Sequence, residues 1–326
     1  MRAFIHGVLV LFLTLGVGLA SSPVQAAGYK APRTADGHPD LQGQWTNASL
    51  THLERPGDLK ALVISEAEAS AYEARQTGAP KIPGDDVGQD TTEVWEQGGK
   101  LARLGGEVRT SWLVEPQDGR LPYSEAGRRL LQASLGGLYT NFDGPEARPA
   151  MERCLLGSNS SSGPPMLNSG YNNNYQFVQT KDALVVVVEM NHDARIIPLA
   201  PAAQPAPAQI RPWMGRSVGR WEGDTLVVET DNFNVIGSWR GSSPLYISPA
   251  ARVTERFTRV SADEIRYEFA VDDPAVFTQV WRGELPLRRA SAAMYEVACH
   301  EGNYSMTGIL AGGRQKDREA AAGAVR

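Results

Sequence analysis

The sequence predicts a mainly β fold, an antiparallel up-and-down barrel with an N-terminal insertion of helix and loop; a two-sheet β-sandwich is the alternative. Roughly eight short segments after Tyr171 are rich in β-branched and aromatic residues and are separated by turn sequences. Apolar and polar residues alternate along 264–271, which is typical of a strand with one buried face. No stretch repeats with a fixed period, which disfavours a propeller.

The N-terminal residues 1–26 have the pattern of a secretory signal peptide. Arg2 precedes an apolar run at 8–20, which is shorter than the roughly 20 residues that cross a bilayer core. Small residues follow, and we expect cleavage after Ala26, with an uncleaved anchor as the alternative. This predicts a periplasmic or secreted protein with no membrane span.

The segments before Tyr171 are mostly irregular, and Ser65 and Glu68 form a capping box that predicts a helix start. The expected elements are an extended arm at 27–40, a strand at 41–47, a helix at 65–76, a loop or mobile insertion at 79–106, a strand at 108–115 and a helix at 124–134. We expect one β-rich domain at 41–314, with an insertion at 50–168 and a disordered tail at 315–326.

The segments after Tyr171 are expected to form the barrel. Valine dominates 184–190, and the sequence Glu222-Gly223-Asp224 predicts a tight turn between two strands. The expected strands lie at 176–180, 184–190, 195–199, 218–221, 225–230, 252–260, 264–271, 277–287 and 294–299. Because most connections are short, neighbouring strands are expected to pair antiparallel.

The composition limits the kinds of partner that the protein can have and indicates the redox state of its cysteines. Lys and Arg number 32 against 37 Asp and Glu, a net charge of −5, so no basic excess favours a nucleic-acid partner. The chain has two cysteines, Cys154 and Cys299. An oxidising compartment favours a disulfide between them, and a free nucleophile or a metal ligand is the alternative.

Several stretches together resemble a family of uncharacterised secreted bacterial proteins. They are PDLQGQW at 39–45, DGRLP at 118–122, ERCL at 152–155, NNNYQ at 172–176, EMNHDARII at 189–197, GRWEGDTLVVET at 219–230 and YEVACHEGNY at 295–304. The resemblance implies secretion and a β-rich core, and it implies no particular reaction. Separately, Gly43-Gln44-Trp45 is similar to the G-x-W element of lipocalins, in which the Trp closes the barrel floor. Lipocalins are about half as long, so the insertion departs from that family.

Histidines near strand ends are the candidate catalytic residues. His192 follows the valine-rich strand, beside Arg195, and His300 follows Cys299. A Cys154–Cys299 disulfide would bring Arg153 close to His300 and Glu301. Such a cluster can act as an acid and base with an arginine clamp. The alternative is a structural role for each group, by backbone hydrogen bonding or ion pairing.

Standard nucleotide, serine-hydrolase and zinc-protease motifs are absent from the sequence, so we expect no cofactor and no metal. A metal site formed by His192, His300 and either Glu301 or Glu189 is the alternative.

The candidate ligand-binding residues are aromatic or polar side chains of the expected barrel strands and their links. They are Asn174, Tyr175, Trp213, Trp221, Glu255 and Trp281. Aromatic side chains inside a barrel can line a cavity for an apolar molecule. Glu255 shares the apolar face of its strand, where burial would raise its pKa. The alternatives are ordinary core packing for the aromatic residues and exposure for Glu255.

Three functions remain open. A binding protein for a small apolar or aromatic molecule predicts an enclosed apolar cavity, with His192 and His300 outside it. A nucleotide-cofactor-independent lyase, isomerase or hydrolase predicts that the candidate catalytic side chains converge at one cavity mouth, within about 12 Å. A structural envelope protein predicts a barrel filled by its own side chains. The sequence leaves open the ligand, the oligomeric state and whether 79–106 is ordered.

Overall fold

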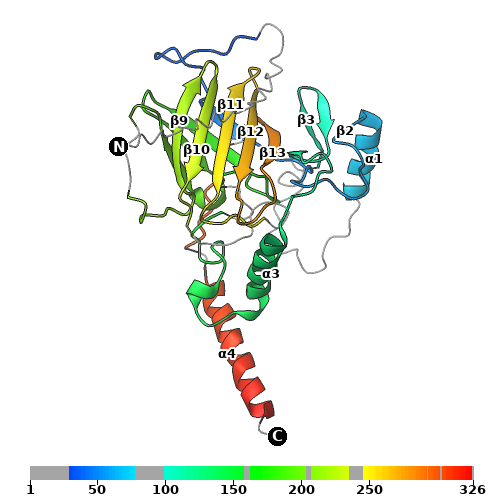
Figure 1. The fold of residues 1–326 in the computed structure, drawn as a ribbon, viewed down its shortest axis with the longest axis vertical. Helices are drawn as coiled ribbons and strands as arrows, with labels where there is room; N and C mark the ends of the chain where they lie inside the picture. The colour runs from blue at the N-terminus through cyan, green and yellow to red at the C-terminus, as the bar shows by residue number, and fades with distance from the viewer. Residues whose placement is uncertain are drawn as a thin grey trace, which may run out of the picture.

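The computed structural model describes residues 29–77, 99–157, 162–202, 207–234, 245–291, 293–301 and 303–324. The predicted signal peptide and residues 79–98 of the predicted insertion lie outside them. Figure 1 shows the barrel-shaped sheet at one end of the molecule, with α1 and a small second sheet beside it. Helices α3 and α4 extend from the other end, where the chain terminates.

The main sheet confirms the predicted antiparallel barrel. It has ten strands, of which β5 (Leu113–Glu115) pairs only with β13, so nine form the barrel path in the order β8-β7-β6-β1-β13-β12-β11-β10-β9. The nine strands are β1 (Gly43–Thr46), β6 (Asn174–Gln179), β7 (Ala183–Val188), β8 (Ala194–Pro198), β9 (Arg216–Glu222), β10 (Thr225–Asp231), β11 (Arg252–Arg259), β12 (Glu264–Asp272) and β13 (Trp281–Arg289).

The barrel cannot be antiparallel all the way round. Every neighbouring pair along the path is antiparallel. With nine strands, the two strands at the ends of the path, β8 and β9, must therefore run in the same direction. They meet in a parallel bridge between Leu199 and Gly219, where the Ala200 N–H donates to the Gly219 carbonyl at 2.8 Å. We call this junction of β8 and β9 the seam.

Buried and more exposed side chains alternate along the strands, as the sequence predicts. Every second side chain is buried along β7 and along most of β12. Gly223 has φ of +60° in the two-residue turn between β9 and β10, a conformation that glycine adopts without strain. β7 stops two residues earlier than predicted. β7 ends at Val188, and a short 3-10 helix, η3 (Met190–His192), follows it with positive φ at Asn191 and His192.

Aromatic rings and an inserted segment fill the described barrel interior. Phe257 and Tyr267 are in ring contact, and Phe269 links Tyr267 to Trp281. We call residues 163–168 the plug segment, because its Met166 and Leu167 belong to the barrel's buried core. Met166 N–H donates to the Tyr267 hydroxyl at 2.9 Å, which fixes the plug segment against β12.

Trp45 of the G-x-W element is completely buried, and its indole N–H donates to the Leu41 carbonyl at 2.9 Å. The guanidinium groups of Arg259 and Arg289 lie over its ring, at 5.6 and 5.0 Å from the centroid. Cation–π contacts of this kind stabilise a buried ring next to charged side chains. This packing joins β1 to the ends of β11 and β13.

The peripheral elements frame the barrel. The capping box is present, since Ser65 N–H donates to Glu68 Oε2 at 2.9 Å before α1 (Glu66–Thr77). The second sheet contains β2 (Val63–Ile64), β3 (Ala102–Leu104) and β4 (Glu107–Arg109). The other helices described are α3 (Glu125–Thr140), α4 (Ser305–Ala324) and the 3-10 helix η1 (Pro145–Ala147). Among the described residues, no helix is both long and apolar enough to cross a membrane.

Two C-terminal predictions differ from the structure. Residues 294–299 are not a strand; they run as an irregular segment that the Cys154–Cys299 disulfide fixes. The predicted disulfide is thereby confirmed. Residues 315–324, expected to be disordered, continue helix α4, because alanine and long charged side chains there favour helix.

Helix α3 provides a test of close packing against the barrel. A Cβ added at Gly127 would lie 2.0 Å from the carbonyl oxygen of Val276, which also accepts hydrogen bonds from Ser124. Gly127→Ala is therefore expected to lower the free energy of unfolding by about 1–3 kcal/mol, as overpacking does. Gly136 of the same helix has no atom near its Cβ position, so Gly136→Ala is the control and should stabilise by about 0.5–1 kcal/mol. Urea unfolding measures both, and equal effects would contradict the contact.

Candidate functional site

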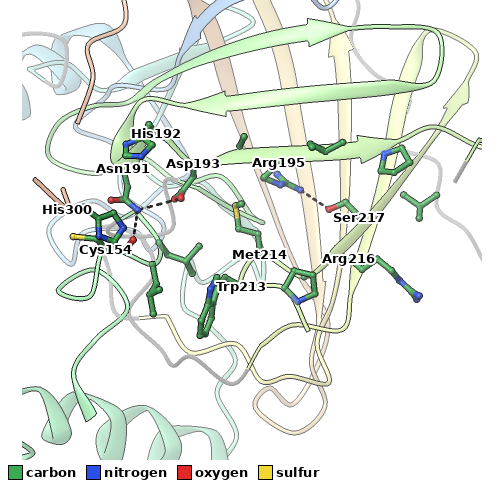
Figure 2. A pocket seen from close by; sticks show the side chains of 18 residues that line it. Cys154, Asn191, His192, Asp193, Arg195, Trp213, Met214, Arg216, Ser217 and His300 are labelled. Atoms are coloured by element: carbon green, nitrogen blue, oxygen red, sulfur yellow. Dashed lines mark hydrogen bonds between the residues drawn. The ribbon is translucent and has the colours of Figure 1, made fainter. Parts of the chain in front are cut away.

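A pocket of about 690 Å³ opens at one end of the seam (Figure 2). It lies between the start of β8 and the start of β9, and the loop after Cys154 forms a further side. Apolar side chains make up most of its lining, including Leu155, Leu156, Ile196, Pro198, Trp213 and Met214.

The seam opens for a reason in the sequence. Ala200 N–H donates to Gly219, so backbone groups at even-numbered positions of β8 and odd-numbered positions of β9 face across the seam. The next donor that β8 would contribute to this parallel ladder is the N–H of residue 198, which is a proline. Pro198 has no N–H to donate to the Ser217 carbonyl. The pairing therefore stops, and the two strands leave room for the pocket.

A buried ion pair closes the pocket toward the barrel interior. Arg195 Nη1 and Nη2 donate to the two carboxylate oxygens of Glu255 at 3.0 and 2.6 Å, and both side chains are at most 2% exposed. Tyr267 donates its hydroxyl proton to Glu255 Oε1 at 2.8 Å, and Arg195 Nη2 also lies 3.4 Å from Ser217 Oγ. The charges thus compensate one another behind the apolar lining.

Burial and the neighbouring Glu255 carboxylate together set the protonation of Tyr267 and Arg195. Burial raises the pKa of Tyr267 well above its ordinary value, and the neighbouring Glu255 carboxylate raises it further, so the phenol stays a proton donor. Burial opposes the charge of Arg195, but Glu255 outweighs that effect and raises the pKa of Arg195. Arg195 is therefore a fixed cation whose two terminal nitrogens are already engaged.

The other end of the pocket is formed by η3 and the disulfide. His192 Nδ1 lies 3.0 Å from the Val297 carbonyl, and Asn191 Nδ2 donates to the Cys154 carbonyl at 3.3 Å. Asp193 accepts hydrogen bonds from Ser162 Oγ and from the Gly157 N–H. Burial raises the pKa of the Asp193 carboxyl, and these hydrogen bonds oppose that rise. Asn191, His192 and Asp193 thus each have a backbone partner, and Asp193 also accepts from the Ser162 side chain.

The pocket brings together part of the predicted catalytic set. His192, Arg195 and His300 all line it (Figure 2). Arg153 and Glu301 are not among its lining residues. Arg153 instead donates to the Glu146 carbonyl at 3.4 Å, and Glu301 is exposed.

The predicted ligand-binding residues divide in the same way. Trp213 lines the pocket. Glu255 lies behind the pocket, where it accepts hydrogen bonds from the lining residue Arg195. The others have partners elsewhere. Tyr175 accepts from Asn47, Asn174 donates to Glu189, Trp221 stacks on His38, and Trp281 packs on Phe269 and Phe277.

Several pocket residues were missed by the sequence analysis, among them Ser217, Met214 and Ile196. The sequence does contain a signal for the buried ion pair behind the pocket. Arg195 shares the inward face of β8 with Ile197, and Glu255 shares the inward face of β11 with Phe257. Two opposite charges on inward faces of a barrel predict a buried pair, because an unpaired buried charge costs several kcal/mol.

The metal alternative has no support in the part of the chain that the structure describes, where no three His, Cys, Asp or Glu side chains are grouped to hold an ion.

No protein-family model, curated protein or solved structure matches this chain. The resemblances to secreted bacterial proteins and to lipocalins therefore stay predictions.

Proposed function

We propose that this β-barrel protein binds a small apolar or aromatic molecule in the pocket at the seam. The observation that supports it best is the pocket's volume of about 690 Å³ together with its mainly apolar lining. Sites for small molecules typically measure 300–1,000 Å³ and combine apolar walls with few polar groups.

The location of this site differs from the sequence-based hypothesis. That hypothesis expected a cavity enclosed by the barrel, with His192 and His300 outside it. The plug segment and the aromatic core occupy the described interior, and both histidines line the pocket in the barrel wall. The ligand is therefore expected to bind between strands β8 and β9, with part of it accessible to solvent.

A second candidate function is a cofactor-independent lyase, isomerase or hydrolase. Its support is that His192 and His300 line the same pocket, where an imidazole can act as a general acid or base. Incubating the bound molecule with the protein and analysing it by mass spectrometry distinguishes the two functions. Recovery of a chemically changed molecule favours the enzyme, and recovery of the unchanged molecule favours the binding protein.

We also propose a periplasmic or secreted location. The disulfide supports it, since such bonds persist in oxidising compartments, and so does the signal-like sequence at 1–26. The intact mass of protein purified from periplasm tests it: a chain that begins at Ala27 is expected, and a full-length chain in the cytoplasm contradicts the proposal.

Trp213 provides the test of the binding site. Titration with 1-aminoanthracene, a neutral aromatic fluorophore, is expected to give saturable binding to the wild-type protein. Trp213→Ala should weaken it by about tenfold, which corresponds to roughly 1.4 kcal/mol of lost ring contact.

Trp221→Ala is the matched control, because Trp221 stacks on His38 and does not line the pocket. Its affinity should stay within about twofold of wild type, a difference of roughly 0.4 kcal/mol. No saturable binding, or equal losses in both variants, would contradict a site at the seam.

A further inference from the structure

We infer that the ligand of this pocket is a short apolar peptide in extended conformation, bound as an additional strand between β8 and β9. The inference rests on the proposed function and names the chemical class of its ligand. It comes from the backbone groups at the open end of the seam.

The edge of β8 presents backbone groups to the pocket. Val188 N–H donates to the Asp193 carbonyl, and Leu199 N–H donates to the Asp182 carbonyl, both at 2.7 Å. Odd-numbered residues of β8 thus bond to β7, and the N–H and C=O groups of Ala194 and Ile196 face the seam. Among the described residues, the backbone bridge found between the two strands is at Leu199, beyond Ala194 and Ile196.

The edge of β9 also presents backbone groups to the pocket. Its two-residue turn to β10 makes Glu222 and Thr225 a hydrogen-bonded pair, so even-numbered residues of β9 bond to β10. The backbone of Ser217 therefore faces the seam, below the bridge at Gly219. An open edge of this kind on both sides of a pocket is the arrangement that captures extended peptides by strand addition.

The strand directions fit one more strand. β8 and β9 run parallel, so a peptide running opposite to both would make antiparallel pairs on each side. Ten strands can close an antiparallel barrel, whereas nine cannot. Small apolar molecules without amide groups would leave these backbone groups unpaired, at a cost in affinity.

The pocket lining sets the side chains and the length. Side chains of a bound strand alternate between the two faces. One face would meet Met214 and Trp213, and the other would lie beside Ile196, which is 67% exposed on the outer surface. The free edge from Ala194 to Ile196 corresponds to roughly 10 Å of strand at about 3.3 Å per residue. This matches a peptide of about three apolar residues.

The test compares two peptides by isothermal titration calorimetry with the full protein. One is N-acetyl-Val-Phe-Val-amide, and the other is the same peptide methylated on the Phe nitrogen. Methylation removes one backbone donor and leaves the side chains unchanged. We expect the parent peptide to bind and the methylated peptide to bind at least tenfold more weakly.

A matched pair of variants tests the protein side. Ile196→Pro removes the N–H that faces the seam without removing a hydrogen bond to β7, and Ile196→Ala keeps that N–H. Because both variants lose the Ile196 side chain, we expect Ile196→Pro to bind the parent peptide at least tenfold more weakly than Ile196→Ala does. Both variants lose the Ile196 side chain from the pocket lining, so their affinities for 1-aminoanthracene should agree within about twofold of each other, which shows that the pocket is equally intact in both.

The outcomes separate this inference from the proposed function. Equal binding of the two peptides overturns the inference. Binding of 1-aminoanthracene without binding of the parent peptide also overturns it and leaves the proposed function standing. Failure of both probes contradicts both. If Ile196→Pro does not fold, the comparison of the two peptides on wild-type protein still decides.

Discussion

Glu255→Ala is expected to lower the free energy of unfolding by about 3–5 kcal/mol, the usual effect of removing one partner from a buried ion pair. Glu255 has no exposed surface, and it is the acceptor for two nitrogens of Arg195 and for the Tyr267 hydroxyl. The variant leaves the Arg195 cation without a counter-charge inside the barrel. Urea unfolding followed by circular dichroism measures the change.

The control for this variant is Glu222→Ala. Glu222 accepts from Arg220 and Arg256 on the barrel surface, where solvent screens the charges, so a loss below about 1 kcal/mol is expected. A double variant, Arg195→Leu with Glu255→Leu, should recover part of the stability, because it removes the unpaired charge. A loss for Glu255→Ala as small as that of the surface variant would contradict a buried pair.

Removal of the Cys154–Cys299 disulfide is the second large expected effect. The bond joins residues 145 apart in sequence, and the chain-entropy account assigns roughly 4–5 kcal/mol to a closed loop of that length. The double variant Cys154→Ser with Cys299→Ser should therefore unfold at much lower urea concentration. Among the described residues, the segment after β13 also contacts the barrel and the loop after β7 through three hydrogen bonds. The N–H groups of Ala290 and Tyr295 donate to the Gln44 carbonyl and to Glu189, and His192 Nδ1 donates to the Val297 carbonyl.

Reduction provides the matching experiment. Dithiothreitol should destabilise the wild-type protein by a similar amount and leave the double serine variant unchanged. If the reduced wild type keeps its stability, the covalent link contributes nothing and the prediction is wrong. Because Cys154 also lines the pocket, 1-aminoanthracene binding should weaken in the reduced protein.

The barrel could be predicted because its strands follow local rules. Alternation along β12 and the Gly223 turn are properties of neighbouring residues, and they fix strand, face and hairpin together. The strand predicted at 294–299 was wrong, because a local pattern does not show whether a partner strand is present. Val297 and its neighbours have strand-like side chains, but they pair with no strand in the structure, and side-chain preference for strands depends on such packing.

The site was only half predictable. His192, Arg195, Trp213 and His300 were identified as chemistry-bearing side chains near strand ends, and the fold brings them to one pocket. The seam itself depends on counting strands around a closed path, which requires knowing that β1 inserts between β6 and β13. Arg195 and Glu255 lie 60 residues apart; the inward face of each strand indicates that each charge needs a partner, but only the folded barrel brings the two strands together.

The place of β1 in the sheet has a consequence for folding. Trp45 is paired with Arg289, a separation of 289 − 45 = 244 residues, and also with Tyr175. Contacts so distant in sequence form slowly, because the chain must first lose the entropy of a very large loop. Until β13 is available, β1 and β12 each present an open edge. The hairpins from β9 to β13 are therefore expected to form first, and the N-terminal strand to close the barrel last.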